Sequence, residues 1–129
     1  MSQFYSLKIG AVALAIALLP AVVGAQSDGA VTQHGNRLAY DAAIKCFVAN
    51  GYAMGVRQRA GDPDTAAIYK AKAHLSFDTA LKLGGMLGLS NDHITEDLSS
   101  VQAQELPPMT KDEAYFENAA ATCRAIGLM

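Results

Sequence analysis

Residues 36–60 read NRLAYDAAIKCFVANGYAMGVRQRA, and the spacing of their apolar side chains predicts a long helix. Small apolar side chains recur every three or four positions along one face, for example at Ala39 and Cys46. Larger apolar side chains flank this face, so the apolar sector is wide enough to contact more than one neighbouring element. Gly51 and Gly55 lie inside the helix and predict a close helix crossing or a bend there.

The segment after this helix predicts a turn and a second helix. Gly61 suits the end of the first helix, Asp62 suits the N-cap of the next, and Pro63 suits its first position. The second helix is expected to run to about Leu83, because the glycine-rich residues 84–88 end or fray it. Two antiparallel helices are therefore expected to meet at this turn.

Two shorter helices are predicted in the C-terminal part of the chain. Ser90 or Asn91 suits the N-cap of a third helix, which is expected to end near Leu106 because residues 107–108 are both proline. Thr110 and Glu113 have the spacing of a capping box, in which two side chains satisfy the first free backbone donors of a helix. A fourth helix is therefore expected to start at this box.

These elements predict an all-α fold, a four-helix up-and-down bundle stapled by one disulfide. Cys46 and Cys123 both fall on apolar helix faces, and in an oxidising compartment their pairing is favoured over a free or metal-binding pair. The cysteines lie 77 positions apart. In the loop-entropy model, a closure of this length contributes about 4 to 5 kcal/mol to stability.

Residues 1–25 have the organisation of a secretory signal peptide that is cleaved after Ala25. An apolar run ends in Val23-Gly24-Ala25, which has the small side chains of a cleavage site. An uncleaved membrane anchor is the alternative, although the apolar run is shorter than the roughly 20 residues that span a bilayer. We therefore expect a flexible leader over 26–35, a single helical domain over 36–129, a periplasmic or secreted location, and no stable membrane insertion after cleavage.

The distribution of charge bears on the kind of partner. Removing Lys8 with the signal leaves 9 basic and 12 acidic residues, a balance that argues against nucleic acid as a partner. Residues 26–89 carry 7 basic and 5 acidic side chains, whereas residues 90–129 carry 2 basic and 7 acidic ones. The two parts either attract each other within one fold or leave an acidic docking face for a basic partner. Four acidic residues are expected to form such a face: Asp92, Glu96, Asp97 and Glu105.

The residues that could carry chemistry form no recognisable set. His93 with Asp97, and His74 with Asp78, have the i,i+4 spacing that could offer two ligands to a metal ion. Two ligands on one helix do not complete a zinc site, and ordinary surface pairs have the same spacing. The chain also lacks a nucleophile elbow and a phosphate-binding glycine loop. We therefore expect no catalytic, metal-binding or cofactor-binding residue and no cofactor.

The two cysteine segments carry a resemblance to known proteins. Residues 40–51, YDAAIKCFVANG, and residues 121–125, ATCRA, resemble small exported all-helical bacterial proteins of unassigned function with one cysteine pair. This resemblance implies a small helical fold and carries over no catalytic residue. Acid-stress chaperones of the periplasm and immunity proteins of secreted toxins share only the architecture, and architecture by itself does not indicate function.

Together these features favour a non-enzymatic periplasmic helical protein that acts by binding a protein partner. The first alternative is a carrier of a small ligand or metal in the bundle interior, suggested by alanine-rich and glycine-rich helices and by the histidines. A second alternative is an immunity-protein-like or stress-chaperone-like role. An enzyme is the least favoured class, because no acid-base or nucleophile set can be named.

Overall fold

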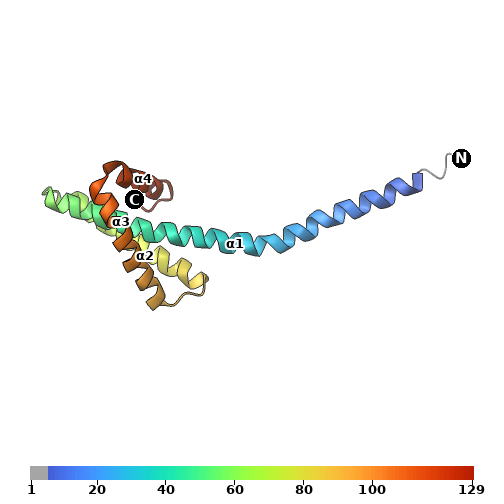
Figure 1. Ribbon diagram of the computed structural model, residues 1–129, viewed down its shortest axis with the longest axis horizontal. Helices are drawn as coiled ribbons and strands as arrows, with labels where there is room; N and C mark the ends of the chain where they lie inside the picture. The colour runs from blue at the N-terminus through green and yellow to red at the C-terminus, as the bar shows by residue number, and fades with distance from the viewer. Residues whose placement is uncertain (1–5) are drawn as a thin grey trace. The chain divides into compact units, whose positions relative to one another are not determined.

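The chain folds into helices joined by short connections. The computed structural model describes the backbone of residues 6–129 and the side chains of residues 29–129. Within residues 6–129 there are four helices and no strand: α1 (Ser6–Arg59), α2 (Pro63–Met86), α3 (Asn91–Lys111) and α4 (Glu113–Ala125) (Figure 1). The predicted all-α class is confirmed.

The chain divides into two compact units, residues 1–35 and residues 36–129. The predicted signal peptide, residues 1–25, lies outside the part of the chain whose side chains are described. Residues 29–35, for which the composition predicts a flexible leader, are an exposed part of α1. A helix that has already nucleated gains one hydrogen bond for each residue added, so it can extend through an exposed segment. None of the helices, over their described residues, has an apolar stretch long enough to cross a membrane.

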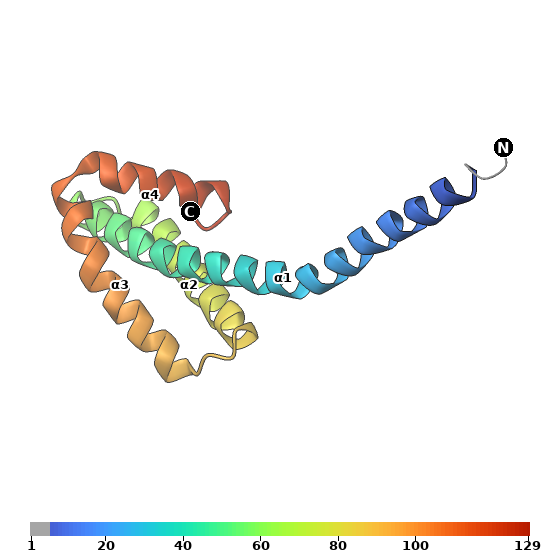
Figure 2. The ribbon, with the colours of Figure 1, turned by 45° about the vertical axis from the view of Figure 1, so that its right-hand side comes forward.

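The second unit is built around residues 36–59 of α1. Figure 2 shows α4 above this segment and α2 crossing behind it. Figure 1 and Figure 2 both show α3 inclined to its neighbours rather than lying alongside them. An up-and-down bundle of four near-parallel helices stays a prediction.

The predicted cysteine pair joins α1 to α4. The Sγ atoms of Cys46 and Cys123 are 2.11 Å apart, and their Cα atoms are 5.6 Å apart. Both cysteines are buried in one apolar core, to which the helices and the C-terminal residues contribute. The other buried members of this core are Tyr40, Ala43, Ile44, Val48, Ala49, Ala80, Ile94, Leu98, Met109 and Leu128.

A buried asparagine adds hydrogen bonds beside the disulfide. Asn50 lies one helical turn after Cys46, and its Nδ2 donates to the Cys46 carbonyl at 2.8 Å and to the Leu128 carbonyl at 2.7 Å. Leu128 reaches this position because Gly127, two residues beyond the end of α4, has a φ of 80° that turns the chain back toward the core. The Leu128 N–H then donates to the Cys123 carbonyl at 2.8 Å, which closes the end of α4.

The helix starts agree in part with the sequence. Asp62 is the N-cap of α2, as predicted, and its Oδ1 accepts from the Thr65 N–H at 3.2 Å. Of the two residues predicted for the N-cap of α3, Ser90 and not Asn91 takes that position, and its Oγ accepts from the His93 N–H at 3.1 Å. The predicted capping box at the start of α4 is wrong. Asp112 caps α4 instead, and its Oδ1 accepts from the Ala114 N–H at 3.0 Å.

The predicted end of the third helix at Leu106 is also wrong, because α3 continues through both prolines to Lys111. Each proline removes one backbone donor from the helix. The helical hydrogen-bond pattern continues beyond the prolines, since the Asp112 N–H donates to the Pro108 carbonyl at 2.9 Å. Burial of Met109, which is 1% exposed, favours this extra turn by adding a large side chain to the core.

The close helix crossing occurs at Gly84 and not at Gly51 or Gly55. A Cβ atom at Gly51 would meet nothing within 4 Å, and one at Gly55 would meet only the side chain of Arg59. A Cβ atom at Gly84 would lie 2.5 Å from Ile94 Cδ1 and 3.2 Å from Tyr40 Cε2. Gly84 is therefore where α1, α2 and α3 approach one another.

This crossing gives a test of the packing. We predict that Gly84→Ala lowers the free energy of unfolding by about 1 to 3 kcal/mol, because the added methyl group overpacks a buried contact. Gly85→Ala is the matched control, since a Cβ atom there meets nothing within 4 Å. Its unfolding free energy should be unchanged or raised by up to about 1 kcal/mol. Urea unfolding of both variants measures this, and equal effects would contradict the crossing.

Candidate functional site

The four acidic residues predicted to form one docking face differ in how exposed they are. Asp92 and Glu96 are exposed on the first half of α3, as a docking face requires. Asp97 is partly buried against α1, and Glu105 is buried between helices. Of the four, Asp92 and Glu96 are the exposed residues.

Asp97 belongs to a contact between α3 and α1. The Tyr40 hydroxyl donates to Asp97 Oδ2 at 2.6 Å, and His93 Nε2 lies 3.4 Å from the same oxygen. The Arg37 guanidinium lies over the Tyr40 ring, 5.5 Å from its centroid. Burial raises the pKa of Tyr40 above its ordinary value of 10.0, and the hydrogen bond to Asp97 raises it further. The arrangement stabilises a neutral tyrosine.

This contact predicts how stability changes at high pH. Above the ordinary tyrosine value of 10.0, the unfolded chain loses the Tyr40 proton while the folded chain keeps it. The free energy of unfolding should therefore fall as the pH rises above about 10. Tyr40→Phe should lower it by about 1 to 3 kcal/mol near neutral pH and should make its alkaline decline shallower. Urea unfolding of both proteins at neutral and alkaline pH tests this, and parallel declines would contradict it.

Glu105 connects three helices at the other end of α3. It accepts a hydrogen bond from the Tyr115 hydroxyl of α4, and its Oε1 lies 3.4 Å from Lys45 Nζ of α1. The hydrogen bond to Glu105 raises the pKa of Tyr115. These three side chains border a cleft of about 440 Å³ that reaches Cys46 and Cys123. Both partners of the buried Glu105 carboxylate belong to this chain, so we interpret these contacts as holding the three helices together.

The three histidines lie on different helices. His34 and His74 are exposed on α1 and α2, and His93 pairs with Asp97 on α3. Among the residues with described side chains, no three or more His, Cys, Asp or Glu come close enough to hold a metal ion.

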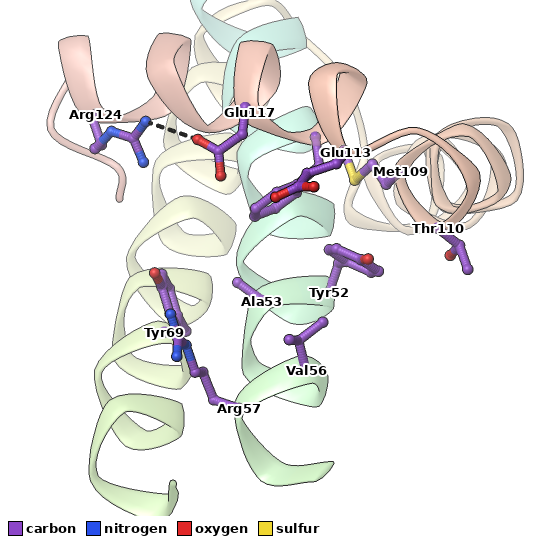
Figure 3. A pocket seen from close by; sticks show the side chains of 11 residues that line it. Tyr52, Ala53, Val56, Arg57, Tyr69, Met109, Thr110, Glu113, Glu117 and Arg124 are labelled. Carbon is purple, nitrogen blue, oxygen red and sulfur yellow. Dashed lines mark ion pairs between the residues drawn. The ribbon is translucent and has the colours of Figure 1, made fainter. Parts of the chain in front are cut away.

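A second cleft, which the sequence did not predict, lies between α1, α2 and α4. Its volume is about 380 Å³, and Met109 of α3 also lines it. Figure 3 shows Tyr52 and Val56 on α1, Tyr69 on α2, and Glu113 and Glu117 on α4 around the opening. We call this the aromatic cleft, because three aromatic side chains line it: Tyr52, Tyr69 and Phe116.

The helical periodicity explains why these side chains share the aromatic cleft. Tyr52 and Val56 are four residues apart on α1, so they lie one above the other on one face. Glu113, Phe116 and Glu117 have i, i+3 and i+4 spacing, so they share one face of α4. The rings of Tyr52 and Phe116 lie 5.0 Å apart between centroids and are tilted by 58°, which fixes one wall.

Charges of both signs line the aromatic cleft. Arg124 Nη2 lies 3.6 Å from Glu117 Oε2, so these two charges are paired. Figure 3 shows this ion pair on α4 as a dashed line. Arg57 comes from α1, next to Asp62, whose pKa is lowered by hydrogen bonds with Thr65 and then by the Arg57 charge. Glu113 makes no ion pair with any residue whose side chain is described.

The sequence pattern concealed the aromatic cleft for a specific reason. Tyr52 lies on the polar side of the helix pattern, which predicts a solvated position. Tyr69 and Phe116 fall on apolar faces, which predict core positions. All three rings are in fact partly buried. The one available signal was the short distance along the sequence between Tyr52 and Arg57, two residue types that protein interfaces favour.

Comparison with known proteins gives no relative: no family model matches the chain, and no curated protein or solved structure matches it either. The resemblance to small exported helical proteins therefore stays a prediction.

Proposed function

We propose that this chain is a non-enzymatic binding protein of an oxidising compartment outside the cytoplasm, and that it docks a protein partner in the aromatic cleft. Cleavage after Ala25 and a periplasmic or secreted location are parts of this proposal. The Cys46–Cys123 disulfide supports the oxidising compartment, because such bonds form and persist there.

The composition and openness of the aromatic cleft are the observation that carries the proposal. Tyrosine, arginine, phenylalanine and methionine are the residue types enriched in the centres of protein interfaces. All four types line this one opening. A cleft of about 380 Å³ that is open to solvent suits a protruding side chain of a partner better than an enclosed ligand.

A rigid frame supports docking there. Cys123 lies two helical turns after Phe116 on α4, and its disulfide to α1 holds the α4 wall against the wall that carries Tyr52. A surface that is already in its binding shape loses less conformational entropy when a partner binds. The exposed acids Asp92 and Glu96 lie outside this cleft. They are therefore not needed for docking.

Site-specific photo-crosslinking in the native host tests this proposal. A photoreactive residue at position 69, in the cleft, should crosslink one partner, and excess wild-type protein should compete for it. Position 70 is the matched control, because Lys70 is the next residue of α2 and is exposed outside the cleft. We expect crosslinking from position 69 and little from position 70. Equal crosslinking from both positions, or none from position 69, would contradict docking in the cleft.

A further inference from the structure

The charges in the aromatic cleft are unequally compensated. Arg124 is paired with Glu117 inside the cleft, at 3.6 Å. Asp62 lies outside the cleft lining. Its pKa is lowered mainly by hydrogen bonds with Thr65 and to a smaller extent by the positive charge of Arg57. Glu113 and Arg57 both make no ion pair with any residue whose side chain is described. Of the two carboxylates in the lining, Glu113 is therefore the one that a positive charge of a partner can pair with.

The aromatic wall favours the same sign of charge. Phe116 follows Glu113 by three positions on α4, so ring and carboxylate lie on one helix face. The Tyr52 ring lies 5.0 Å from the Phe116 ring, at a tilt of 58°. The face of an aromatic ring is negative, so a cation placed over it is attracted. A carboxylate beside two rings is an arrangement that binds an ammonium or guanidinium group.

On this basis we propose that the occupant of the aromatic cleft is a lysine or arginine side chain of the partner, with its cation at Glu113 and its aliphatic stem against Tyr52 and Phe116. This inference rests on the proposed function, since it names the chemistry of the group that docks. It also relocates the acidic docking site from α3 to α4. The net negative charge of the C-terminal part of the chain then favours approach of a basic partner.

Three blocked amino acids probe the cleft without the partner: N-acetyl-lysine methylamide, its neutral counterpart N-acetyl-norleucine methylamide, and the anionic N-acetyl-glutamate methylamide. Titrations followed by the ring resonances of Tyr52 and Phe116 give the dissociation constants. We expect the lysine probe to bind about three- to tenfold more tightly than the norleucine probe, the contribution of an exposed cation beside rings and a carboxylate. The glutamate probe should bind most weakly.

Matched variants assign the preference to named groups. Glu113→Gln should remove the advantage of the lysine probe over the norleucine probe. Phe116→Leu should reduce that advantage while keeping an apolar side chain. Glu96→Gln removes an exposed carboxylate of α3 outside the cleft and should change nothing. Thermal unfolding of each variant shows whether a loss of binding reflects loss of the fold.

The outcomes separate this inference from the proposed function. Equal binding of the lysine and norleucine probes, or tightest binding of the glutamate probe, would overturn the cationic occupant and leave partner docking in the cleft intact. A lysine preference that survives Glu113→Gln would overturn the role of Glu113. Absence of ring shifts with every probe, together with crosslinking from position 69, would also overturn this inference alone. Loss of both signals would overturn the proposed function as well.

Discussion

The structure of residues 36–129 depends on one ring of bonds that joins α1 to the C-terminal end of the chain. The disulfide links Cys46 to Cys123, whose carbonyl accepts from the Leu128 N–H at 2.8 Å. Asn50 then donates to the carbonyls of Leu128 and Cys46, at 2.7 and 2.8 Å, which closes the ring. These residues are buried, so loss of the Asn50 donor would leave the Leu128 carbonyl unsatisfied in the core. The covalent bond and the hydrogen bonds therefore hold each other in place.

This ring also accounts for the aromatic cleft. Phe116 lies two turns before Cys123 on α4, and Tyr52 lies between one and two turns after Cys46 on α1. The distance between the two walls is thus set by a bond in the core rather than by the residues that line the opening. The core side chains near the disulfide are small, such as Ala43 and Ala49, so their burial contributes little to stability. The disulfide therefore contributes a larger share of the stability than it would in a core of large side chains.

The features that could be predicted from the sequence are those that depend on neighbours along the chain. The caps at Asp62 and Ser90 and the helical periodicity have local causes, and the pairing of Cys46 with Cys123 follows because only two cysteines are present. The tight crossing at Gly84 and the helical turn beyond the prolines depend on tertiary contacts with Ile94, Tyr40 and the core around Met109. The aromatic cleft is of the second kind, because its walls come from helices far apart in sequence.

The most direct test of the ring is a cycle of four unfolding measurements, with Asn50 or alanine at position 50 and with the disulfide oxidised or reduced. In the oxidised protein, Asn50→Ala should lower the free energy of unfolding by about 1 to 3 kcal/mol, because the buried Leu128 carbonyl loses its donor while the Cys46 carbonyl keeps only its backbone bond within α1. After reduction, α4 and Leu128 are no longer held against α1, and the same substitution should cost at least about 1 kcal/mol less. An equal cost in the oxidised and reduced proteins would show that the disulfide and the Asn50 hydrogen bonds act independently, and would contradict this account.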